Sequence, residues 1–377
     1  MSASGRVAAP DVADDRRFMG LALSLGRRGL GRTWPNPAVG AVIVKDGEIV
    51  GRGWTQPGGR PHAEIEALRR AGEMARGATL YVTLEPCSHH GKSPPCADAV
   101  IASGIARVVS AMEDPNPEVA GRGHARLRSA GITVDVGIEA ATARRDHAGH
   151  IRRMRDGRPH VMLKLAISAD GKVAGAGRKR VTITGNAVRE RVHLMRARSD
   201  AIMIGVGTAL ADDPVLTCRL PGMAKMSPTR VVLDAGLRLP MQSRLLATAG
   251  ETPLWIMTGK KAPAASETAV RQLGAEVVRV AEEAGRLDPR EVLKLLATRG
   301  ITRLMVEGGP TVASALIEAD LIDEAVFFNS PIVIGEEGLP ALERRAAQLR
   351  SEHLARVSSE PVGPDRQETY ERGSDHV

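Results

Sequence analysis

Apolar residues recur with helical spacing near the start of the chain. Phe18, Leu21, Ala22 and Leu25 follow an i, i+3, i+4, i+7 pattern, which places one stripe of a helix over residues 14–28 against a core. Two β-rich runs then flank Asp46-Gly47, a pair typical of a hairpin turn. Helical and strand patterns alternate up to about residue 140. The expected elements are strands at 38–44, 48–54, 78–84 and 105–112 and helices at 62–70 and 97–103.

Residues 146–160 have little apolar content and contain a Gly and a Pro, so we expect the end of a helix and a linker there. The alternation then restarts. Strands are expected at 161–168, 200–207, 229–235, 253–259, 302–307 and 323–329, and helices at 186–198, 266–274, 288–299 and from Thr311. This order predicts an α/β second domain with a largely parallel sheet, hence domains at 1–150 and 151–377. The polar last twenty or so residues are expected to fray.

Composition and charge narrow the class of protein. The 377 residues exceed the ~250–300 at which one core stops growing, and 43% apolar with 25% charged residues is ordinary for a globular chain. Three Trp, two Tyr and three Phe leave little material for stacking single-stranded nucleic acid. The net charge of +8 is spread along the chain, which favours small anionic substrates over a polynucleotide.

The N-terminal segment lacks an apolar core, and no run of ~18 apolar residues occurs, so neither secretion nor a membrane span is expected. Three cysteines cannot form a disulfide framework and fit a reducing compartment better. We therefore expect a cytoplasmic protein with no membrane partner.

The strongest chemical pattern is His62-Ala63-Glu64 followed by Glu85-Pro86-Cys87 and Cys96. One imidazole and two thiolates leave the fourth position of a tetrahedral zinc ion open for water, as in catalytic sites. Zinc lowers the pKa of bound water from ~15.7 to ~7 and so provides a nucleophile at neutral pH, while Glu64 would carry protons. This is the pattern of zinc deaminases. A closed structural site, with His89 or His90 as fourth ligand, is the alternative, but it leaves Glu64 without a task.

Eight residues separate Cys87 from Cys96, whereas nucleic-acid and nucleoside deaminases commonly have two. The segments TWPNPAVGAVIV, HAEIEAL, TLEPCSHHGKSPPCADAVI and EDPNPEVAGRG closely resemble the deaminase half of the bacterial bifunctional riboflavin-biosynthesis deaminase/reductase family, from residue 14 to about 150. The resemblance implies a cytidine-deaminase-like three-layer domain that removes the 2-amino group of 2,5-diamino-6-(5-phosphoribosylamino)pyrimidin-4(3H)-one. It also implies zinc ligands His62, Cys87 and Cys96, the proton carrier Glu64, and the substrate contacts Asn36 and Lys92.

The second half has no G-x-G-x-x-G motif. Its best fingerprint is VEGGPTVASAL at 306–316, where a strand pattern passes through two glycines into a helix whose N-terminal N–H groups suit phosphate. Together with LKLAISADGK, LMRARSDAIMIGVGTALADDPVLTCR and RVVLDAGLRLP, this segment resembles the reductase domain of the same family, which is similar to dihydrofolate reductase. The resemblance implies NADPH-dependent reduction of the ribosyl group to a ribityl chain.

Site residues of the reductase half follow from the same resemblance. The implied NADPH contacts are Ala166, Thr208, Asp212, Gly309, Pro310, Thr311, Val312, Ala313, Ser314 and Ala315. The implied substrate contacts are Lys164, Arg196, Leu216, Arg219 and Glu307. One departure stands out: where the family usually has Gly-Glu-Ser and a Trp before Ile-Thr, this chain has Arg178, Lys179, Arg180 and Thr182, so an aromatic wall is missing.

Two rival functions remain open at this point. The first is a zinc deaminase of polynucleotides such as tRNA with an unrelated second domain, and the second is a non-catalytic, zinc-stabilised binding protein. The scarcity of aromatic residues counts against the first, and Glu64 counts against the second. We expect a phosphoribosyl pyrimidine as the partner, together with Zn²⁺ and NADPH, and no nucleic acid; the sequence leaves homo-oligomerisation open.

Overall fold

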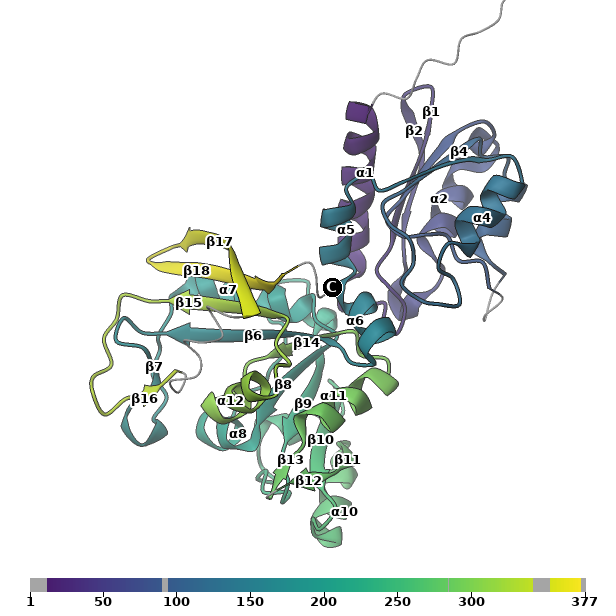
Figure 1. Ribbon diagram of the computed structural model, residues 1–377. Coiled ribbons are helices and arrows are strands. Elements are labelled where there is room, and N and C mark those ends of the chain that lie inside the picture. Colours follow the sequence, from purple (N-terminus) through teal and green to yellow (C-terminus); the bar gives the residue numbers. More distant parts are fainter. Residues whose placement is uncertain (1–11, 90–93, 284, 342–352, 374–377) are drawn as a thin grey trace, which may run out of the picture. The chain divides into compact units, whose positions relative to one another are not determined.

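The computed structural model describes residues 12–89, 94–283, 285–341 and 353–373 (Figure 1). The chain divides into two compact units, Met1–Arg155 and Asp156–Val377. In the described ranges no helix combines the length and the apolar character that a bilayer span requires.

The first unit is a sheet with helices on both faces. In the described residues its strands are β1 (Gly40–Lys45), β2 (Glu48–Trp54), β3 (Thr79–Val82), β4 (Arg107–Ser110) and β5 (Thr133–Val136). Its helices are α1 (Val12–Gly26), α2 (Ala63–Ala71), α3 (Cys96–Ala102), α4 (Arg122–Ser129), α5 (Ala140–Asp146) and α6 (Ala148–Asp156). The strand order is β2-β1-β3-β4-β5; β1 runs antiparallel to both neighbours, and β3, β4 and β5 are parallel.

Alternation along β1 builds the two cores of this unit. Ala41 and Ile43 join the cluster that includes α2, α3 and α4, whereas Val42 and Val44 join the cluster with α1 and α5. Successive side chains of a strand point to opposite faces, so one apolar run serves both layers. Figure 1 shows α1 and α5 on one side of the sheet and α2 and α4 on the other.

The second unit is built on a longer sheet. Its described strands are β6 (His160–Ile167), β7 (Lys172–Ala174), β8 (Ala201–Gly205), β9 (Thr229–Leu233), β10 (Leu254–Gly259), β11 (Glu276–Val280), β12 (Glu282–Glu283), β13 (Arg286–Leu287), β14 (Arg303–Val306), β15 (Glu324–Asn329), β16 (Leu339–Pro340), β17 (Leu354–Val362) and β18 (Asp365–Arg372). Its described helices are α7 (Asn186–Ala197), α8 (Val206–Asp212), α9 (Arg244–Ala247), α10 (Ala264–Gln272), α11 (Pro289–Thr298) and α12 (Pro310–Glu318). Among these residues the main sheet has nine strands in the order β11-β10-β9-β8-β14-β6-β15-β18-β17.

The expectation of a largely parallel sheet is confirmed, because every pairing from β11 through β15 is parallel. The expectation that the last twenty or so residues fray is wrong for the part that the structure describes, which ends at residue 373. β17 and β18 form an antiparallel hairpin, and β18 pairs with β15. The ring of Tyr370 packs 5.5 Å from that of Phe327, measured between centroids. Cross-strand pairing and one buried aromatic thus stabilise a segment whose composition is polar.

For residues 146–160 the sequence predicts the end of a helix and a linker. The structure places α6 at 148–156, so the linker before β6 has only three residues, 157–159. The helix buries polar side chains as well as Ile151, and the buried His150 lies 3.0 Å from Asp114 through its Nε2 and Oδ1 atoms. A hydrophobic pattern cannot reveal a helix that is held in place by such polar contacts.

Candidate active sites

Helix α2, which begins directly after His62 and contains Glu64, packs on strand β2. A Cβ atom on Gly51 would stand 2.4 Å from the carbonyl oxygen of Ala67, and one on Gly53 would stand 2.4 Å from that of Ala63. These two glycines are on the same face of β2 because they are two positions apart. Only hydrogen fits at these two positions, so the sequence Gly-Arg-Gly sets the close approach of the helix.

Three side chains from separate segments converge at the start of α2. His62 immediately precedes the helix, Cys87 follows β3, and Cys96 opens α3. Their ligand atoms all lie within 4.8 Å of one another. Nδ1 of His62 is 3.3 Å from Sγ of Cys96 and 3.8 Å from Sγ of Cys87, and the backbone N–H of Cys96 donates to Cys87 at 3.2 Å. One nitrogen and two sulfurs facing a common point fit a zinc ion.

Electrostatics at Cys87 support this interpretation. Hydrogen bonding with Cys96 and then the neighbouring His62 lower the pKa of Cys87 to about 4, against the opposing effect of burial, whereas the same hydrogen bond and burial raise the pKa of Cys96. A lowered pKa favours the thiolate, the form that binds metals. Burial raises the pKa of Glu64 to about 7, and the carboxyl interacts with His62, Cys87 and Cys96. A carboxyl with a pKa near neutrality can both accept and release a proton.

Glu85 has a structural task that the sequence did not reveal. Its carboxylate accepts four backbone N–H groups, from Asp114, Gly121, Gly123 and His124, at 2.7–3.1 Å. These bonds tie the Glu-Pro-Cys segment to the start of α4. Glu85, Glu113 and His124 also lie close enough together to be considered as metal ligands. The four N–H donors already satisfy the carboxylate of Glu85, however, so we assign Glu85 a positioning function.

The remaining predicted residues of the first site divide into two groups. Asn36 lies beside the ligands, with its Nδ2 donating to the carbonyl of Gly59 at 2.8 Å and lying 3.4 Å from Nε2 of His62. Lys92 and His90 lie outside the described residues. Exposed His89 does not belong to the zinc-type cluster found among the described residues.

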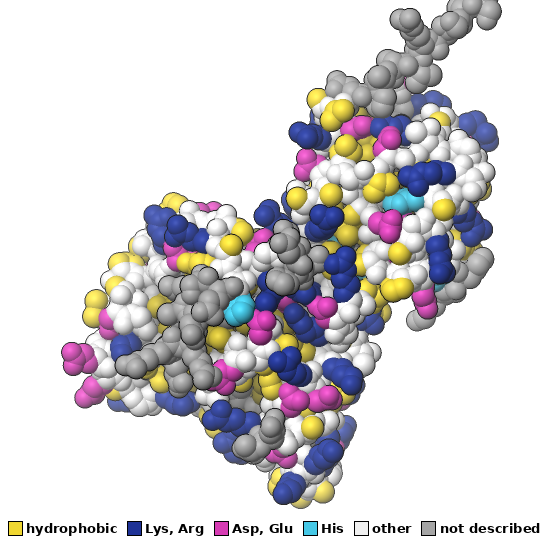
Figure 2. Space-filling model, viewed as in Figure 1, with side chains coloured by type: hydrophobic (Ala, Val, Ile, Leu, Met, Phe, Trp, Pro, Cys, Tyr) yellow, Lys and Arg dark blue, Asp and Glu magenta, His cyan; other side chains and the backbone are white. Residues whose placement is uncertain are grey.

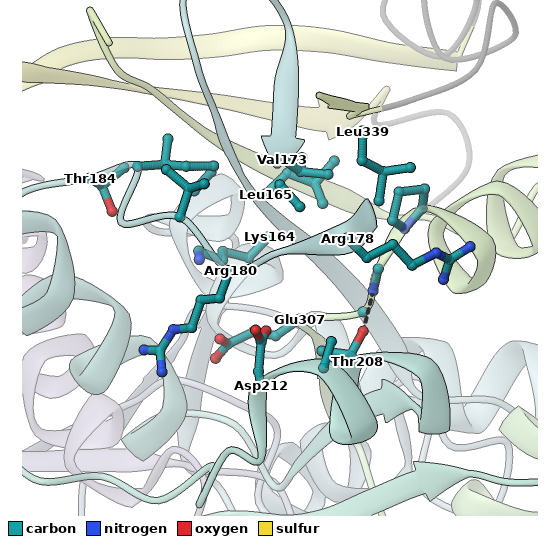
Figure 3. A pocket seen from close by; sticks show the side chains of 18 of the residues that line it. Lys164, Leu165, Val173, Arg178, Arg180, Thr184, Thr208, Asp212, Glu307 and Leu339 are labelled. Carbon is teal, nitrogen blue, oxygen red and sulfur yellow. Dashed lines mark hydrogen bonds between the residues drawn. The ribbon is translucent and has the colours of Figure 1, made fainter. Parts of the chain in front are cut away.

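The second unit contains two adjoining cavities. The first, of about 310 Å³, lies between the end of β6, the segment 178–184, α8 and the turn before α12 (Figure 3). The second, of about 320 Å³, extends beside α8 toward residues 214–219. Both are lined by Arg180, Thr208, Asp212 and Glu307. The hydroxyl of Thr208 accepts the N–H of Gly309 at 3.0 Å, which joins the two strand-to-helix turns that form the cavity floor.

An ion pair stands at the junction of the two cavities. The Arg196 guanidinium donates from Nε to Oε1 of Glu307 at 2.6 Å and from Nη2 to Oε2 at 2.9 Å. Burial by itself would raise the pKa of Glu307, but Arg196 and then Lys164 outweigh it and lower the pKa to about 2. Burial lowers the pKa of Lys164, and the negative charge of Glu307 partly opposes this shift. Glu307 is therefore a fixed negative charge between two cations.

Most of the predicted reductase residues line these cavities. Lys164, Ala166, Thr208, Asp212, Glu307, Gly309 and Pro310 line the first, and Arg196, Leu216 and Arg219 line the second. Leu216 is buried with a φ of 60°, a left-handed conformation that is costly for leucine and that is concentrated at functional sites. Thr311, Val312, Ala313, Ser314 and Ala315 line neither cavity; they lie within α12, where Val312 and Ala313 pack into the core.

Sequence reasoning did not assign several cavity residues, of which Arg178, Arg180, Arg189 and Arg244 carry charge. The sequence signal for two of them is the departure from the family pattern at residues 178–182, to which the sequence alone assigns no role. No aromatic side chain among the described residues lines either cavity, in agreement with the missing Trp.

Comparison with known proteins decides the family. Residues 12–112 match the model of the cytidine and deoxycytidylate deaminase zinc-binding region, and residues 159–367 match the RibD C-terminal domain. The riboflavin biosynthesis protein RibD of Escherichia coli (strain K12) is 44% identical, over 93% of this chain and 97% of its own. This chain belongs to the RibD family. The RibD of Bacillus amyloliquefaciens is 42% identical, over 92% of this chain and 94% of its own.

Solved structures of RibD proteins agree over the whole chain. Form 1 of Acinetobacter baumannii RibD has a TM-score of 0.85 and 35% identity, and covers 97% of this chain and 100% of its own. A deaminase/reductase from Thermotoga maritima has a TM-score of 0.83 and 33% identity, and covers 96% of this chain and 99% of its own.

Membership of the RibD family confirms the expected function and fold class. The chain is a bifunctional enzyme of riboflavin biosynthesis, with a cytidine-deaminase-like half and a reductase half similar to dihydrofolate reductase. It acts on a small-molecule pyrimidine and uses Zn²⁺ and NADPH. The nitrogen and sulfur donors of the first unit fit the metal, and the cavities of the second unit fit a phosphorylated cofactor through the α12 N-terminus and their arginines.

Proposed function

We propose that His62, Cys87 and Cys96 hold the zinc ion and that Glu64 is the catalytic proton carrier of the deaminase half. The observation that carries this proposal is the convergence of Nδ1 and two Sγ atoms within 4.8 Å, with the buried Glu64 two residues after His62. Zinc, when bound, supplies a nucleophile from water at neutral pH. Glu64 takes the proton that this water releases and delivers it to the departing amine.

The substrate proposed for this half is 2,5-diamino-6-(5-phosphoribosylamino)pyrimidin-4(3H)-one. Water enters at C2, the 2-amino group leaves as ammonia, and the corresponding uracil is formed. We assign Asn36 to the pyrimidine edge because an amide both donates and accepts hydrogen bonds, and because it lies beside His62. Lys92 is assigned to the substrate phosphate on the resemblance of its loop alone.

In the reductase half we propose that the cofactor occupies the first cavity. The contacts assigned at this cavity are Ala166, Thr208, Asp212, Gly309 and Pro310. Thr311, Val312, Ala313, Ser314 and Ala315 are assigned on the resemblance alone, since they line neither cavity. The supporting feature is the start of α12, because Gly309 and Pro310 line the cavity there and the positive end of a helix dipole suits a phosphate. NADPH, when bound, supplies a hydride.

The substrate contacts proposed for the reductase half are Lys164, Arg196, Leu216, Arg219 and Glu307. Carbon C1 of the ribosyl group gains a hydride and the open chain gains a proton, which leaves a ribityl group. Glu307 remains charged and holds Arg196 by two hydrogen bonds, which orients the guanidinium beside the second cavity. The product is 5-amino-6-(5-phosphoribitylamino)uracil.

Domain limits, partners and location complete the proposal. We place the deaminase domain near residues 1–155, a few residues beyond the sequence-based limit of 150, because α6 continues to Asp156. On the face shown in Figure 2, Lys and Arg side chains are scattered among Asp and Glu, which supports a small-molecule substrate over nucleic acid. Free Cys87, Cys96 and Cys218 support a reducing cytoplasm.

A single incubation tests the proposed function. The purified chain is mixed with the diaminopyrimidine phosphate, with and without NADPH, and the products are analysed by mass spectrometry. We expect only the deaminated uracil in the absence of NADPH and the ribityl product in its presence. Recovery of unchanged diaminopyrimidine under both conditions would contradict the proposal.

A further inference from the structure

The second cavity of the reductase half contains more positive charge than its own residues neutralise. Four arginines line it, Arg180, Arg196, Arg219 and Arg244, against two carboxylates, Asp212 and Glu307. Glu307 is fully engaged by Arg196. One carboxylate therefore remains for three guanidiniums.

Among the described residues, those three guanidiniums have no close protein partner. Within the ranges that the structure describes, the side chains of Arg180, Arg219 and Arg244 make neither a hydrogen bond nor an ion pair. Arg180 attracts Asp212 only at longer range. Burial, and then repulsion from Arg196 and Arg244, lower the pKa of Arg219, which agrees with the lining of one cavity by all three cations. A group of like charges around one cavity is stabilised by an anion that accepts from several of them.

The two cavities differ in the anion that they suit. The N-terminus of α12 lines only the first, and a helix N-terminus suits the diphosphate of a dinucleotide. The second cavity is lined by arginines instead. Planar guanidinium groups match the three oxygens of a phosphate monoester. Figure 3 shows Arg178 and Arg180 extending in opposite directions. Arg178 lines only the first cavity, whereas Arg180 lines both cavities.

We propose that Arg180 is a specificity-determining residue of the reductase half, which together with Arg219 and Arg244 binds the phosphate monoester dianion of the substrate. This inference rests on the proposed function, because it takes that substrate as given. It assigns a role to two residues, Arg180 and Arg244, outside the assigned contact set. It also gives the Arg-Lys-Arg departure a physical meaning: the segment 178–182 contributes a cation to the substrate phosphate.

The test compares Arg180→Ser, Arg180→Lys and Arg244→Ser with the wild-type chain in steady-state reduction of the deaminated phosphoribosyl substrate. Lys179→Ser is the matched control, because Lys179 is a neighbouring exposed cation that lines neither cavity. We expect Arg180→Ser to raise the KM for substrate about 10- to 100-fold, since a hydrogen bond to a charged group is lost. Arg180→Lys should recover part of this loss, and Lys179→Ser should have no effect.

Two further measurements identify the source of the phosphate. The dephosphorylated ribosyl substrate should react equally slowly with wild-type and Arg180→Ser chains. Inorganic phosphate should inhibit the wild type more strongly than it inhibits Arg180→Ser. The substitution should change neither the KM for NADPH nor the preference for NADPH over NADH. A change in cofactor preference without a change in substrate KM would assign the anion to the cofactor and overturn the proposal, as would an unchanged Arg180→Ser enzyme. A wild-type chain that does not oxidise NADPH with the phosphorylated substrate would instead disprove the proposed function itself.

Discussion

Gly53 of β2 lies so close to Ala63 of α2 that a Cβ atom on the glycine would stand 2.4 Å from the alanine carbonyl oxygen. Ala63 is the residue between His62 and Glu64, so this contact fixes the distance of the proposed zinc ligand and the proposed proton carrier from the sheet. The small side chains of Ala67 and Ala71 continue the close packing along the helix.

Substituting Gly53 with Ala should therefore displace the start of α2. We expect a loss of about 3 kcal/mol in the free energy of unfolding, because the clash is with backbone atoms that cannot rotate away. Zinc content after dialysis should fall as His62 moves. Gly20→Ala is the control: its Cβ meets nothing within 4 Å, and alanine in this exposed helix position should add about 0.5–1 kcal/mol of stability. Wild-type stability and zinc retention in Gly53→Ala would contradict the packing argument.

The role of Glu64 predicts a variant that binds metal without turning over. Glu64→Gln should reduce the rate of ammonia release about 10²- to 10⁴-fold, because proton transfer is lost. The zinc content should stay at about one ion per chain. Metal analysis and an ammonia assay on the same sample measure both quantities. Glu66→Gln is the matched control, since Glu66 lies in the same helix and pairs with Arg69 and Arg70. Retained deamination in Glu64→Gln would remove Glu64 from the mechanism.

The two activities should be separable by one substitution in the first unit. Cys87→Ser removes the sulfur whose pKa is lowered to about 4, so zinc binding and deamination should be lost. Oxidation of NADPH with the deaminated substrate, followed by absorbance, should continue at the wild-type rate. Simultaneous loss of both activities in a folded Cys87→Ser chain would show that the halves are not independent.

Glu307 predicts an acid-dependent contribution to stability. Its pKa is lowered from 4.5 to about 2 in the folded chain, so the ionised form stabilises the fold above about pH 4.5, and this contribution is lost as the pH falls toward 2. The shift corresponds to about 3 kcal/mol. Urea unfolding should show wild type more stable than Glu307→Gln near pH 6, with the difference narrowing in acid. A difference that is constant with pH would mean that the ion pair with Arg196 does not set the titration.

The sequence alone determined the order of elements and the chemistry of the first site. Period and turn residues predicted the hairpin at β1 and β2 and the helix α2, because local spacing decides which side of an element is apolar. The proposed zinc ligands could be named from the sequence because His, Glu and Cys with this order and spacing have few other uses. Resemblance to a family supplied the reductase residues, which no local pattern in the second half could provide.

Only the tertiary structure decided how distant segments complete each other. The polar C-terminal residues became β17 and β18 because β15 offered an unpaired edge, and composition does not encode such an edge. Glu85 acquired four N–H partners from residues 29–39 positions away. Arg180 became a cavity residue because the segment after β7 and helix α8 line the same cavities. In each case the free energy comes from contacts between groups far apart in sequence, whose distances are fixed only when the sheets have formed.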